Sequence, residues 1–401
     1  MAHVRSLFFT GAASESESKA QEAKRLGRPS SLIWNITNRC NLLCAHCYMA
    51  ADGHVLPDQL TDEQAYAMID RIAEAGIPVV FLSGGEPMMR PNFWEILERI
   101  SAAGVSSTIS TNCTFITAES AQRLADNGVR FIATSLYGPR EYHDRLTCVP
   151  GTYDKVVNAI KYLRDVNVKV VIKTALTRET YPYIYDLIAQ AKEMDCSMIY
   201  ICDLITSGRS AGEEAMRVSN EQWRELCDFI IEEMADPDNT FEYDLGAIPS
   251  SIPYIAQALV QRGLDISKGL ERLNIFSACP VGQGHMTINS EGGVMPCQFA
   301  QDWTVGNIHE ISFAEATNRL HELDSAEPEG MCAPQSCAYS RICRGCRVKA
   351  WQRTGGNSGG NPMAEDTSCI LDRDERSGQS LEAGCSDESP LRYAPCQVSS
   401  C

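Results

Sequence analysis

From residue 32 onward, short apolar runs alternate with segments whose apolar residues recur with helical periodicity. The apolar runs predict strands at Leu32–Ile36, Val79–Leu82, Ser106–Ser110, Arg130–Ser135, Lys169–Ala175 and Ser197–Cys202. The intervening segments predict helices at Thr61–Glu74, Phe93–Ala102, Glu119–Asn127, Tyr153–Asp165 and Tyr183–Met194. Strands that alternate with helices pair in parallel through right-handed crossovers, so the pattern predicts an α/β fold. An open doubly wound sheet and a barrel fit it equally well.

Several predicted helices carry start and stop signals. Thr61 with Gln64 has the spacing of a capping box, in which each side chain satisfies a free amide of the other residue. Gly76, Gly104 and Gly128 each follow a predicted helix, where glycine commonly adopts the left-handed conformation that ends it. These signals support the predicted order of elements.

Three cysteines follow the first predicted strand. Cys40, Cys44 and Cys47 have the spacing C-x3-C-x2-C. Three thiolates on one loop can bind three irons of a [4Fe–4S] cluster and leave the fourth iron without a protein ligand, whereas ferredoxin-type carriers use four cysteines. A small chelating molecule can bind an open metal corner of this kind. A partial zinc site or incidental buried thiols are the simpler alternatives.

Composition excludes several classes of protein. The 401 residues are 44% hydrophobic and 22% charged, as in an ordinary soluble globular protein. The net charge of −17, without a basic stripe, argues against nucleic-acid binding. The apolar patch Leu7–Phe9 is too short for a signal peptide, and no stretch approaches the length of a membrane span. Eighteen cysteines without a secretory signal therefore predict a cytoplasmic metalloprotein.

The second predicted strand runs into Leu82-Ser-Gly-Gly-Glu-Pro87. Gly84 and Gly85 would let the backbone approach a ligand, and the carboxylate of Glu86 can meet an ammonium group. Such a turn is a weak signal by itself. One strand after C-x3-C-x2-C, it becomes a strong one.

The cysteine loop and the Gly-Gly-Glu turn together resemble the radical S-adenosylmethionine (SAM) superfamily. The resemblance implies an incomplete barrel of six strands, with its chemistry at their C-terminal ends. It implies a [4Fe–4S] cluster on the three catalytic cysteines, with SAM chelating the fourth iron and Gly84, Gly85 and Glu86 binding the SAM amino group. An electron from a flavodoxin- or ferredoxin-type reductant would yield a 5′-deoxyadenosyl radical that abstracts hydrogen from a substrate.

Polar residues at later strand ends contact the ribose and carboxylate of SAM in these relatives. The resemblance therefore implies SAM contacts for Asn112, Ser135 and Lys173. The simpler alternative is a hydrogen bond from each side chain to the next loop. His46 and His143 could each be a proton donor or a haem ligand, although an ordinary loop histidine is the simpler interpretation.

The C-terminal part is rich in cysteine. Cys279 and Gly292-x4-Cys297 are followed by Cys332-x4-Cys337-x5-Cys343-x2-Cys346 and by Cys369. This series resembles the SPASM extension of radical SAM enzymes, which holds one or two auxiliary iron–sulfur clusters, although two of its spacings differ from the commonest form. The resemblance implies that one cluster is bound by Cys279, Cys297 and Cys346 with a corner open to another ligand, and the other by Cys332, Cys337, Cys343 and Cys369. A zinc ribbon would leave three of these thiols unused.

The chain thus divides into a flexible segment (1–30), the barrel (31–215), a helical bridging segment (216–275), the SPASM-type domain (276–372) and a disordered tail (373–401) that carries Cys385, Cys396 and Cys401. The other cysteines are most simply small buried hydrophobic residues, at Cys113, Cys148, Cys196, Cys202 and Cys227.

Within the superfamily, the chain resembles the enzymes of haem d1 and alternative haem biosynthesis, which modify carboxylate side chains of tetrapyrroles. The matching stretches are Leu32–Cys40, Phe81–Pro91, Ser110–Asn112, Thr206–Arg209 and Ile342–Arg347. Cys113, Tyr137 and Cys148 depart from the pattern of that group, and we expect them to face the substrate pocket.

Two other functions remain open. Peptide-modifying maturases share this architecture, but only 39 residues precede Cys40, too few for the peptide-recognition module that many of them carry. The sequence therefore favours a small-molecule substrate. A multi-cluster electron-transfer protein would have sets of four cysteines throughout and no Gly-Gly-Glu turn.

Overall fold

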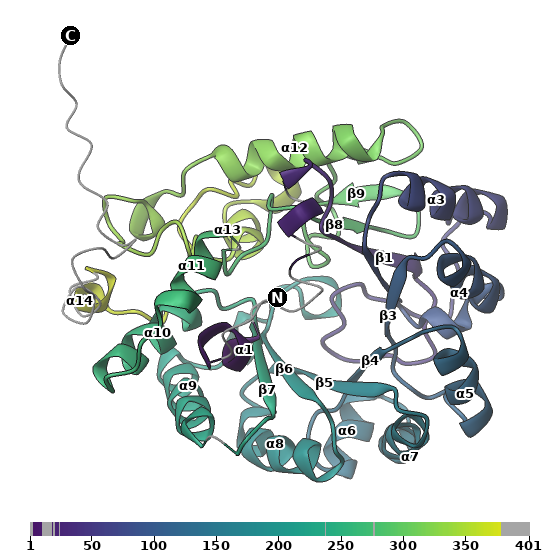
Figure 1. Cartoon of the computed structure of the whole chain (residues 1–401), viewed down its shortest axis with the longest axis horizontal. Helices are drawn as coiled ribbons and strands as arrows, with labels where there is room; N and C mark the ends of the chain where they lie inside the picture. Colours follow the sequence, from purple (N-terminus) through teal and green to yellow (C-terminus); the bar gives the residue numbers. More distant parts are fainter. Residues whose placement is uncertain are drawn as a thin grey trace.

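The computed structural model describes residues 3–9, 18, 21–23, 25–236, 238–275 and 277–377. A curved sheet with parallel strands β1–β7 forms its centre, and helices surround it (Figure 1). Trp34, Ile132 and Ile199 are fully buried members of the core that joins the sheet to these helices. The strands are β1 (Ser31–Thr37), β2 (Val79–Gly84), β3 (Ser106–Ser110), β4 (Phe131–Ser135), β5 (Lys169–Leu176), β6 (Met198–Asp203), β7 (Glu242–Gly246), β8 (His285–Ile288), β9 (Gly293–Met295) and β10 (Gly306–Asn307).

The helices are α1 (Val4–Phe9), α3 (Asp62–Glu74), α4 (Phe93–Ala102), α5 (Ala118–Asp126), α6 (Arg140–Thr147), α7 (Thr152–Asp165), α8 (Ile184–Glu193), α9 (Asn220–Ala235), α10 (Ser251–Gln261), α11 (Ser267–Ile275), α12 (Phe313–Ser325), α13 (Arg347–Arg353) and α14 (Arg373–Arg376). Short 3-10 turns are η1 (Pro87–Met89), η2 (Tyr181–Tyr183), η3 (Gly208–Ser210), η4 (Glu214–Met216), η5 (Gly330–Cys332) and η6 (Gly356–Ser358).

The predicted α/β alternation is confirmed, and each predicted strand and helix lies within two residues of an observed one. Thr61 and Gln64 form the predicted capping box at the start of α3. Gly76, Gly104 and Gly128 have φ angles of 65°, 72° and 73°, the left-handed conformation expected where a helix ends.

The sheet extends beyond the six predicted strands at both edges. β7 pairs in parallel with β6, so a purely helical bridging segment is wrong there. The acidic residues Glu242 and Asp244 interrupt the apolar run of this strand, so the sequence pattern includes it in the helical segment, whereas Tyr243 and Leu245 are buried in the core. At the other edge β8 pairs in parallel with β1, so the SPASM-type region continues the same sheet.

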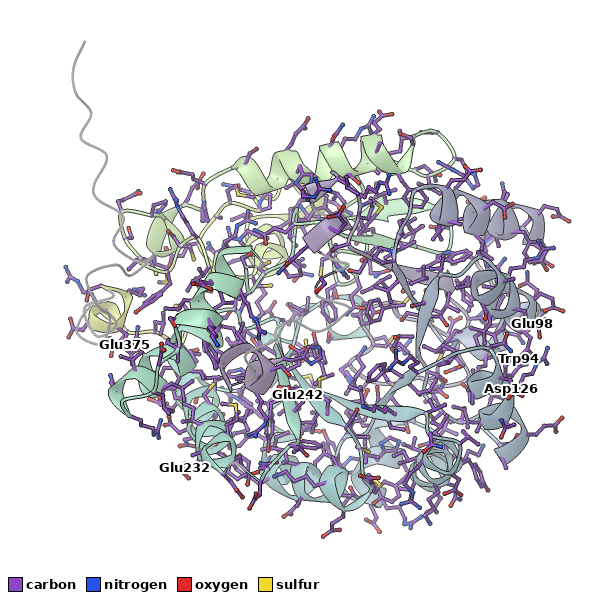
Figure 2. All side chains as sticks on the ribbon, in the orientation of Figure 1. Trp94, Glu98, Asp126, Glu232, Glu242 and Glu375 are labelled. Atoms are coloured by element: carbon purple, nitrogen blue, oxygen red, sulfur yellow. The ribbon has the colours of Figure 1, made fainter. Side chains whose placement is uncertain are left out.

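The prediction of a flexible N-terminal segment is wrong for α1. Leu7 and Phe8 of this helix are buried in the core, which makes docking favourable. The carboxylate of Glu242 accepts hydrogen bonds from the amides of Arg5 (2.7 Å) and Ser6 (3.0 Å), so β7 satisfies the free N-terminus of α1. Figure 2 labels Glu242 beside this helix, near the centre of the barrel.

The predicted disordered tail begins with an ordered turn. Asp372 and Glu375 form a capping box on α14, whereas Cys385, Cys396 and Cys401 lie outside the described residues. Within the described ranges, no helix is both long enough and apolar enough to cross a membrane.

Candidate functional site

The structure brings the three cysteines of the C-x3-C-x2-C loop together. The loop directly follows β1 at the C-terminal end of the barrel strands, and all three side chains are half-buried. The thiol of Cys44 lies within electrostatic reach of both Cys40 and Cys47. The amide of Cys40 donates to the Asp52 carbonyl at 2.5 Å, which fixes the start of the loop against its end. One short loop therefore presents a compact set of three thiols.

The Gly-Gly turn after β2 packs against this loop. A Cβ atom on Gly84 would lie 2.2 Å from the Thr37 carbonyl, and one on Gly85 would lie 2.4 Å from the Arg39 carbonyl. The amides of Gly85 and Glu86 donate to those same carbonyls, each at 2.8 Å. We expected these glycines to make room for a ligand. They make room first for the backbone of residues 37–39, which leads from β1 into the cysteine loop and which they hold beside β2.

Glu86 is completely buried beneath the loop. Its carboxylate accepts hydrogen bonds from the Thr111 hydroxyl (2.8 Å), the Asn112 amide (2.7 Å) and the Met88 amide (3.0 Å). Burial nevertheless raises the pKa of Glu86 to about 7, because these donors only partly replace lost hydration. A carboxylate has about four acceptor positions, so three donor groups leave room for one more, such as an ammonium.

Asn112 at the end of β3 buttresses the cysteine loop. Its side-chain amide donates to the side-chain oxygen of Asn41 (Oδ1) at 2.8 Å and lies 3.8 Å from the Cys40 sulfur. Its own carbonyl oxygen accepts from the Thr114 hydroxyl at 2.7 Å. In this structure, Asn112 orients a thiol of the cluster loop.

Sequence reasoning missed a clamp that follows β6. The guanidinium of Arg209 donates to the Cys44 carbonyl (2.7 Å) and to the Ala51 carbonyl (2.8 Å), and the Arg209 amide donates to the Cys47 carbonyl (3.0 Å). A Cβ atom on Gly208 would lie 2.3 Å from that Cys47 oxygen. The stretch Thr206–Arg209 resembles the tetrapyrrole-modifying enzymes in sequence, but its spacing does not indicate that it contacts the cysteine loop.

A cavity lies beside the loop. Its lining residues are His46, Tyr48, Ser135, Tyr137, Lys173, Thr174, Ala175, Tyr200, Cys202, Asp203, Leu204, Ile205, Gln298 and Phe299. Lys173 donates to the Ser110 hydroxyl at 3.3 Å and lies 5.8 Å from the centre of the Tyr200 ring. Burial lowers the pKa of Lys173. The barrel, the cysteine loop and the C-terminal region all contribute to this cavity.

The three departures from the tetrapyrrole group differ in position. Tyr137 lines the cavity, and its hydroxyl lies 3.1 Å from the His46 Nε2 atom, while its ring stacks on His143 at 5.6 Å. Cys113 is instead buried in the core, and Cys148 is exposed at the end of α6. Only Tyr137 therefore matches the expectation of a pocket-facing change.

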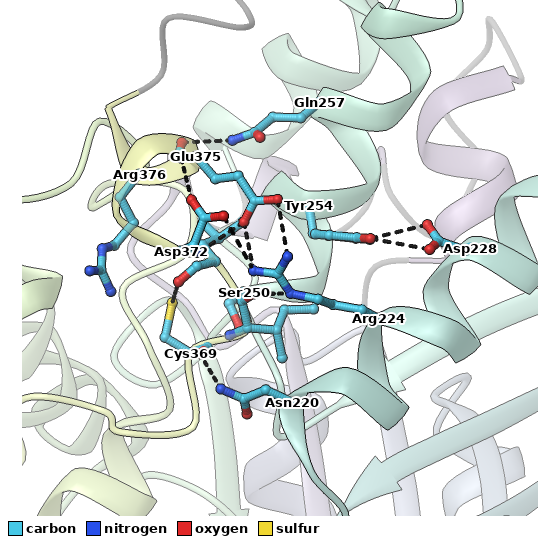
Figure 3. Close-up of polar contacts among 12 residues, drawn as sticks. Asn220, Arg224, Asp228, Ser250, Tyr254, Gln257, Cys369, Asp372, Glu375 and Arg376 are labelled. Atoms are coloured by element: carbon cyan, nitrogen blue, oxygen red, sulfur yellow. Dashed lines mark hydrogen bonds and ion pairs between the residues drawn. The ribbon is translucent and has the colours of Figure 1, made fainter.

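The C-terminal cysteines fall into two neighbourhoods. Cys297 and Cys346 are each within electrostatic reach of Cys279. Cys343 is within reach of the thiols of the second expected set, Cys332, Cys337 and Cys369. Figure 3 shows how Cys369 is held: the Asn220 side chain donates to its carbonyl at 2.8 Å. Each neighbourhood contains cysteines of one of the two sets that the resemblance implies, and the assignment of these cysteines as cluster ligands stays a prediction.

These donor sets suit iron–sulfur clusters. Soft thiolates select iron–sulfur clusters or zinc, but among the described residues no three His, Cys, Asp or Glu side chains converge closely enough to bind a single ion. Burial raises the pKa of Cys40 to about 11 and of Cys44 to about 12, because a buried thiolate loses its hydration. Iron supplies the missing positive charge, so cluster assembly would release these protons.

Comparisons with known proteins agree with this chemistry. Residues 34–191 match the Radical SAM superfamily, and residues 279–347 match the SPASM iron-sulfur cluster-binding domain. The AdoMet-dependent heme synthase of Oleidesulfovibrio alaskensis is 28% identical over 346 residues, covering 84% of this chain and 86% of that protein. The mycofactocin maturase MftC of Mycolicibacterium smegmatis is 28% identical over 331 residues, covering 81% and 79%.

The fold also has solved counterparts. SuiB of Streptococcus suis, in its complex with the precursor peptide SuiA, superposes with a TM-score of 0.67 at 18% identity, covering 89% of this chain and 79% of that chain. The two family matches fall on the two thiol-bearing regions. The cofactors are therefore a [4Fe–4S] cluster, SAM and auxiliary iron–sulfur clusters. The chain is a radical SAM enzyme with a C-terminal SPASM domain.

Proposed function

We propose that this enzyme abstracts a hydrogen atom from a carboxylate-bearing side chain of an iron tetrapyrrole. The bound cluster and SAM would supply the 5′-deoxyadenosyl radical that performs this abstraction. Cys40, Cys44 and Cys47 would hold the cluster, and Glu86 would accept the SAM ammonium at its remaining acceptor position. The haem synthase relative supports this substrate class.

The cavity is the observation that carries the proposal. Tyr48, Tyr137, Tyr200 and Phe299 present aromatic rings to it, and flat conjugated ligands pack well against such rings. Lys173 places a half-buried ammonium among them, which suits a carboxylate. A flat aromatic acid satisfies both features at once.

A peptide is the second candidate substrate, and the mycofactocin maturase relative supports it. A peptide carboxylate could also pair with Lys173, while aromatic or aliphatic side chains could contact the rings. We further propose a flavodoxin- or ferredoxin-type reductant and a cytoplasmic location, supported by the eighteen cysteines.

The test uses the full chain, reconstituted anaerobically with iron and sulfide. Production of 5′-deoxyadenosine from SAM and dithionite is followed alone, with an iron tetrapyrrole that carries propionates, and with a candidate precursor peptide. Stimulation by the tetrapyrrole and consumption of its side chain support the proposal. Stimulation by the peptide alone would replace it with the second candidate.

Lys173→Met separates two roles of the half-buried ammonium. If Lys173 binds the SAM carboxylate, as Ser135 nearby is also expected to help do, the variant weakens SAM binding without substrate present. If it binds the substrate, SAM affinity stays unchanged and the substrate KM rises. We expect at least a tenfold change in one constant, because a buried charge-assisted hydrogen bond contributes about 1.5–3 kcal/mol.

A further inference from the structure

The cluster set Cys279, Cys297 and Cys346 supplies three thiols, whereas a [4Fe–4S] cluster has four irons. The resemblance left its fourth corner open. The barrel brings one more cysteine to this place. Cys202 is buried at the end of β6, in register with Gly246 of β7.

Packing places Cys202 next to the set. Ala247, the residue after that register partner, packs in a small apolar cluster with Cys297 and Cys346. Ile205, three residues after Cys202, belongs to the same apolar cluster. Cys202 and Phe299, which lies two residues after Cys297, line the same cavity. The residues that flank Cys202 in the sheet and along the chain therefore pack against two of the cluster cysteines.

Cys202 shares two polar neighbours, Tyr48 and Lys349, with cysteines of the cluster set. The Cys202 thiol lies close enough to Cys297 to contribute to raising its pKa. The thiols of Cys202 and Cys297 both contribute to raising the pKa of the Tyr48 hydroxyl. Lys349 acts on the thiols of both Cys202 and Cys346. The ammonium of Lys349 donates to the Ala247 carbonyl at 2.6 Å, which fixes it between strand β7 and helix α13.

Cys202 also differs from the other buried cysteines of the barrel region. Cys113, Cys196 and Cys227 belong to the main hydrophobic core, where a thiol behaves as a small apolar side chain. Cys202 lies outside that core and faces a cavity lined by Lys173 and Tyr200. The environment of Cys202 therefore suits a thiol that binds a metal better than one that only packs in a hydrophobic core.

We propose that Cys202 is the fourth protein ligand of the iron–sulfur cluster bound by Cys279, Cys297 and Cys346. The barrel and the SPASM domain would then share one cluster, which would tie β6 to the C-terminal region. With all four irons bound by protein, this cluster could transfer electrons but could not bind the substrate through iron. The inference rests on the family assignment and holds whether the substrate is a tetrapyrrole or a peptide.

The test starts from a parent variant in which Cys40, Cys44 and Cys47 are all replaced by alanine. The SAM-binding cluster is then absent, and roughly eight iron atoms per chain remain in the auxiliary clusters. Cys202→Ala is made in this parent, with Cys227→Ala as the matched control, because Cys227 is also buried but lies in the main core. Electron paramagnetic resonance spectra of the reduced proteins are recorded with and without excess cyanide, a ligand for an open iron.

We expect cyanide to leave the spectra of the parent and of Cys227→Ala unchanged and to shift one signal in Cys202→Ala. Oxidation should convert that cluster to a [3Fe–4S] form in Cys202→Ala alone. A loss of about four irons from Cys202→Ala, with circular dichroism unchanged, also supports the ligand role.

A cyanide response in the parent, with the same response in Cys202→Ala, overturns the proposal. Should Cys202→Ala fail to fold, Cys202→Ser keeps the side-chain volume and decides by the same spectra. An unaltered cluster signal in a folded Cys202→Ser protein overturns the ligand role, and an altered one supports it.

Discussion

Two cysteine-bearing regions of this chain are held in place by different means. In the SAM-cluster loop, the thiols lie within residues 40–47. Backbone amides directly after β2 hold the chain that enters the loop, and the amide and guanidinium of Arg209 after β6 hold the loop itself. The contacts through Gly85, Glu86 and Arg209 reach backbone carbonyls between residues 37 and 47 at 2.7–3.0 Å. Because these anchors belong to the barrel, its folding alone positions the three thiols.

The second region, residues 332–369, has little regular structure of its own: η5, η6 and the seven-residue α13. Side chains of α9 and α10 hold its end, as Figure 3 shows. Arg224 donates to the Ile370 carbonyl and to the Glu375 carboxylate, both at 2.8 Å, and the Ser250 hydroxyl accepts from the Ile370 amide at 3.1 Å. Side-chain contacts from the helices therefore hold this region in place, whereas the first region is held mainly by backbone groups at the ends of strands.

The difference teaches how each region depends on iron. A loop anchored by a sheet is organised before its cofactor binds, whereas a segment of turns and thiols gains order from the metal that it binds. Loss of iron should therefore disable the first region chemically and unfold the second locally.

The largest expected effect is on chemistry at the first region. Cys44→Ala should abolish SAM cleavage, because two thiols cannot hold the cluster that SAM chelates. The barrel should keep its melting temperature, since Cys44 is half-buried and its loop stays anchored. Anaerobic assays of 5′-deoxyadenosine with calorimetry check both parts. Persistent cleavage would show that the cluster is bound elsewhere.

Iron removal should act mainly on the second region. After anaerobic chelation, hydrogen exchange is expected to accelerate strongly across 332–369 and only slightly across 31–203, which the parallel strands protect. Mass spectrometry of peptides from the iron-loaded and iron-free proteins measures this directly. Equal loss of protection in both ranges would mean that the barrel also needs its cluster to fold.

Gly85→Ala would break the anchor of the first region without touching a thiol. The added methyl group would meet the Arg39 carbonyl at 2.4 Å, and such overpacking costs about 1–3 kcal/mol. We expect a lower free energy of unfolding and loss of SAM-cluster iron, with auxiliary iron retained. Gly53→Ala is the matched control, because its methyl group has no neighbour within 4 Å. Similar losses in both variants would contradict the anchoring role.

The sequence predicted the first region better than the second for a physical reason. Apolar periodicity predicted β1–β6, and parallel pairing places the ends of those strands on one edge, so the Gly-Gly-Glu turn had to meet the cysteine loop. Their contacts could not be read from spacing. The clamp by Arg209 and the burial of Glu86 against Thr111 depend on how the strand ends turn, which periodicity does not describe.

Burial patterns explain what was missed elsewhere. β7 carries Glu242 and Asp244, and two charged residues are unusual in a buried strand. Glu242 accepts a hydrogen bond from Arg5, and Asp244 lies near Lys173, so residues far away in the sequence stabilise these charges. The sequence around Asp203 similarly gives no indication of an ion pair, yet Asp203 is buried and paired with both Arg217 and Lys349. Such pairs join residues far apart in sequence, so only the assembled fold reveals them.

The smallest expected effect comes from the side-chain anchors of the second region. Arg224→Ala would remove the hydrogen bond to Ile370 and the ion pair with Glu375, a loss of about 1–2 kcal/mol because the arginine side chain is partly buried. We expect faster hydrogen exchange around residues 366–376 and lower auxiliary iron, with SAM cleavage retained.

Arg123→Ala is the matched control for Arg224→Ala. Arg123 pairs with Glu98 at 2.7 Å between exposed positions on α4 and α5 and lies 4.3 Å from the centre of the Trp94 ring, so its loss should lower the free energy of unfolding by about 1 kcal/mol without a direct effect on residues 366–376. Figure 2 labels Glu98 on the outer ring of helices. If both variants leave exchange at 366–376 unchanged, the clusters themselves hold the second region, and the contrast with the sheet-anchored loop becomes sharper still.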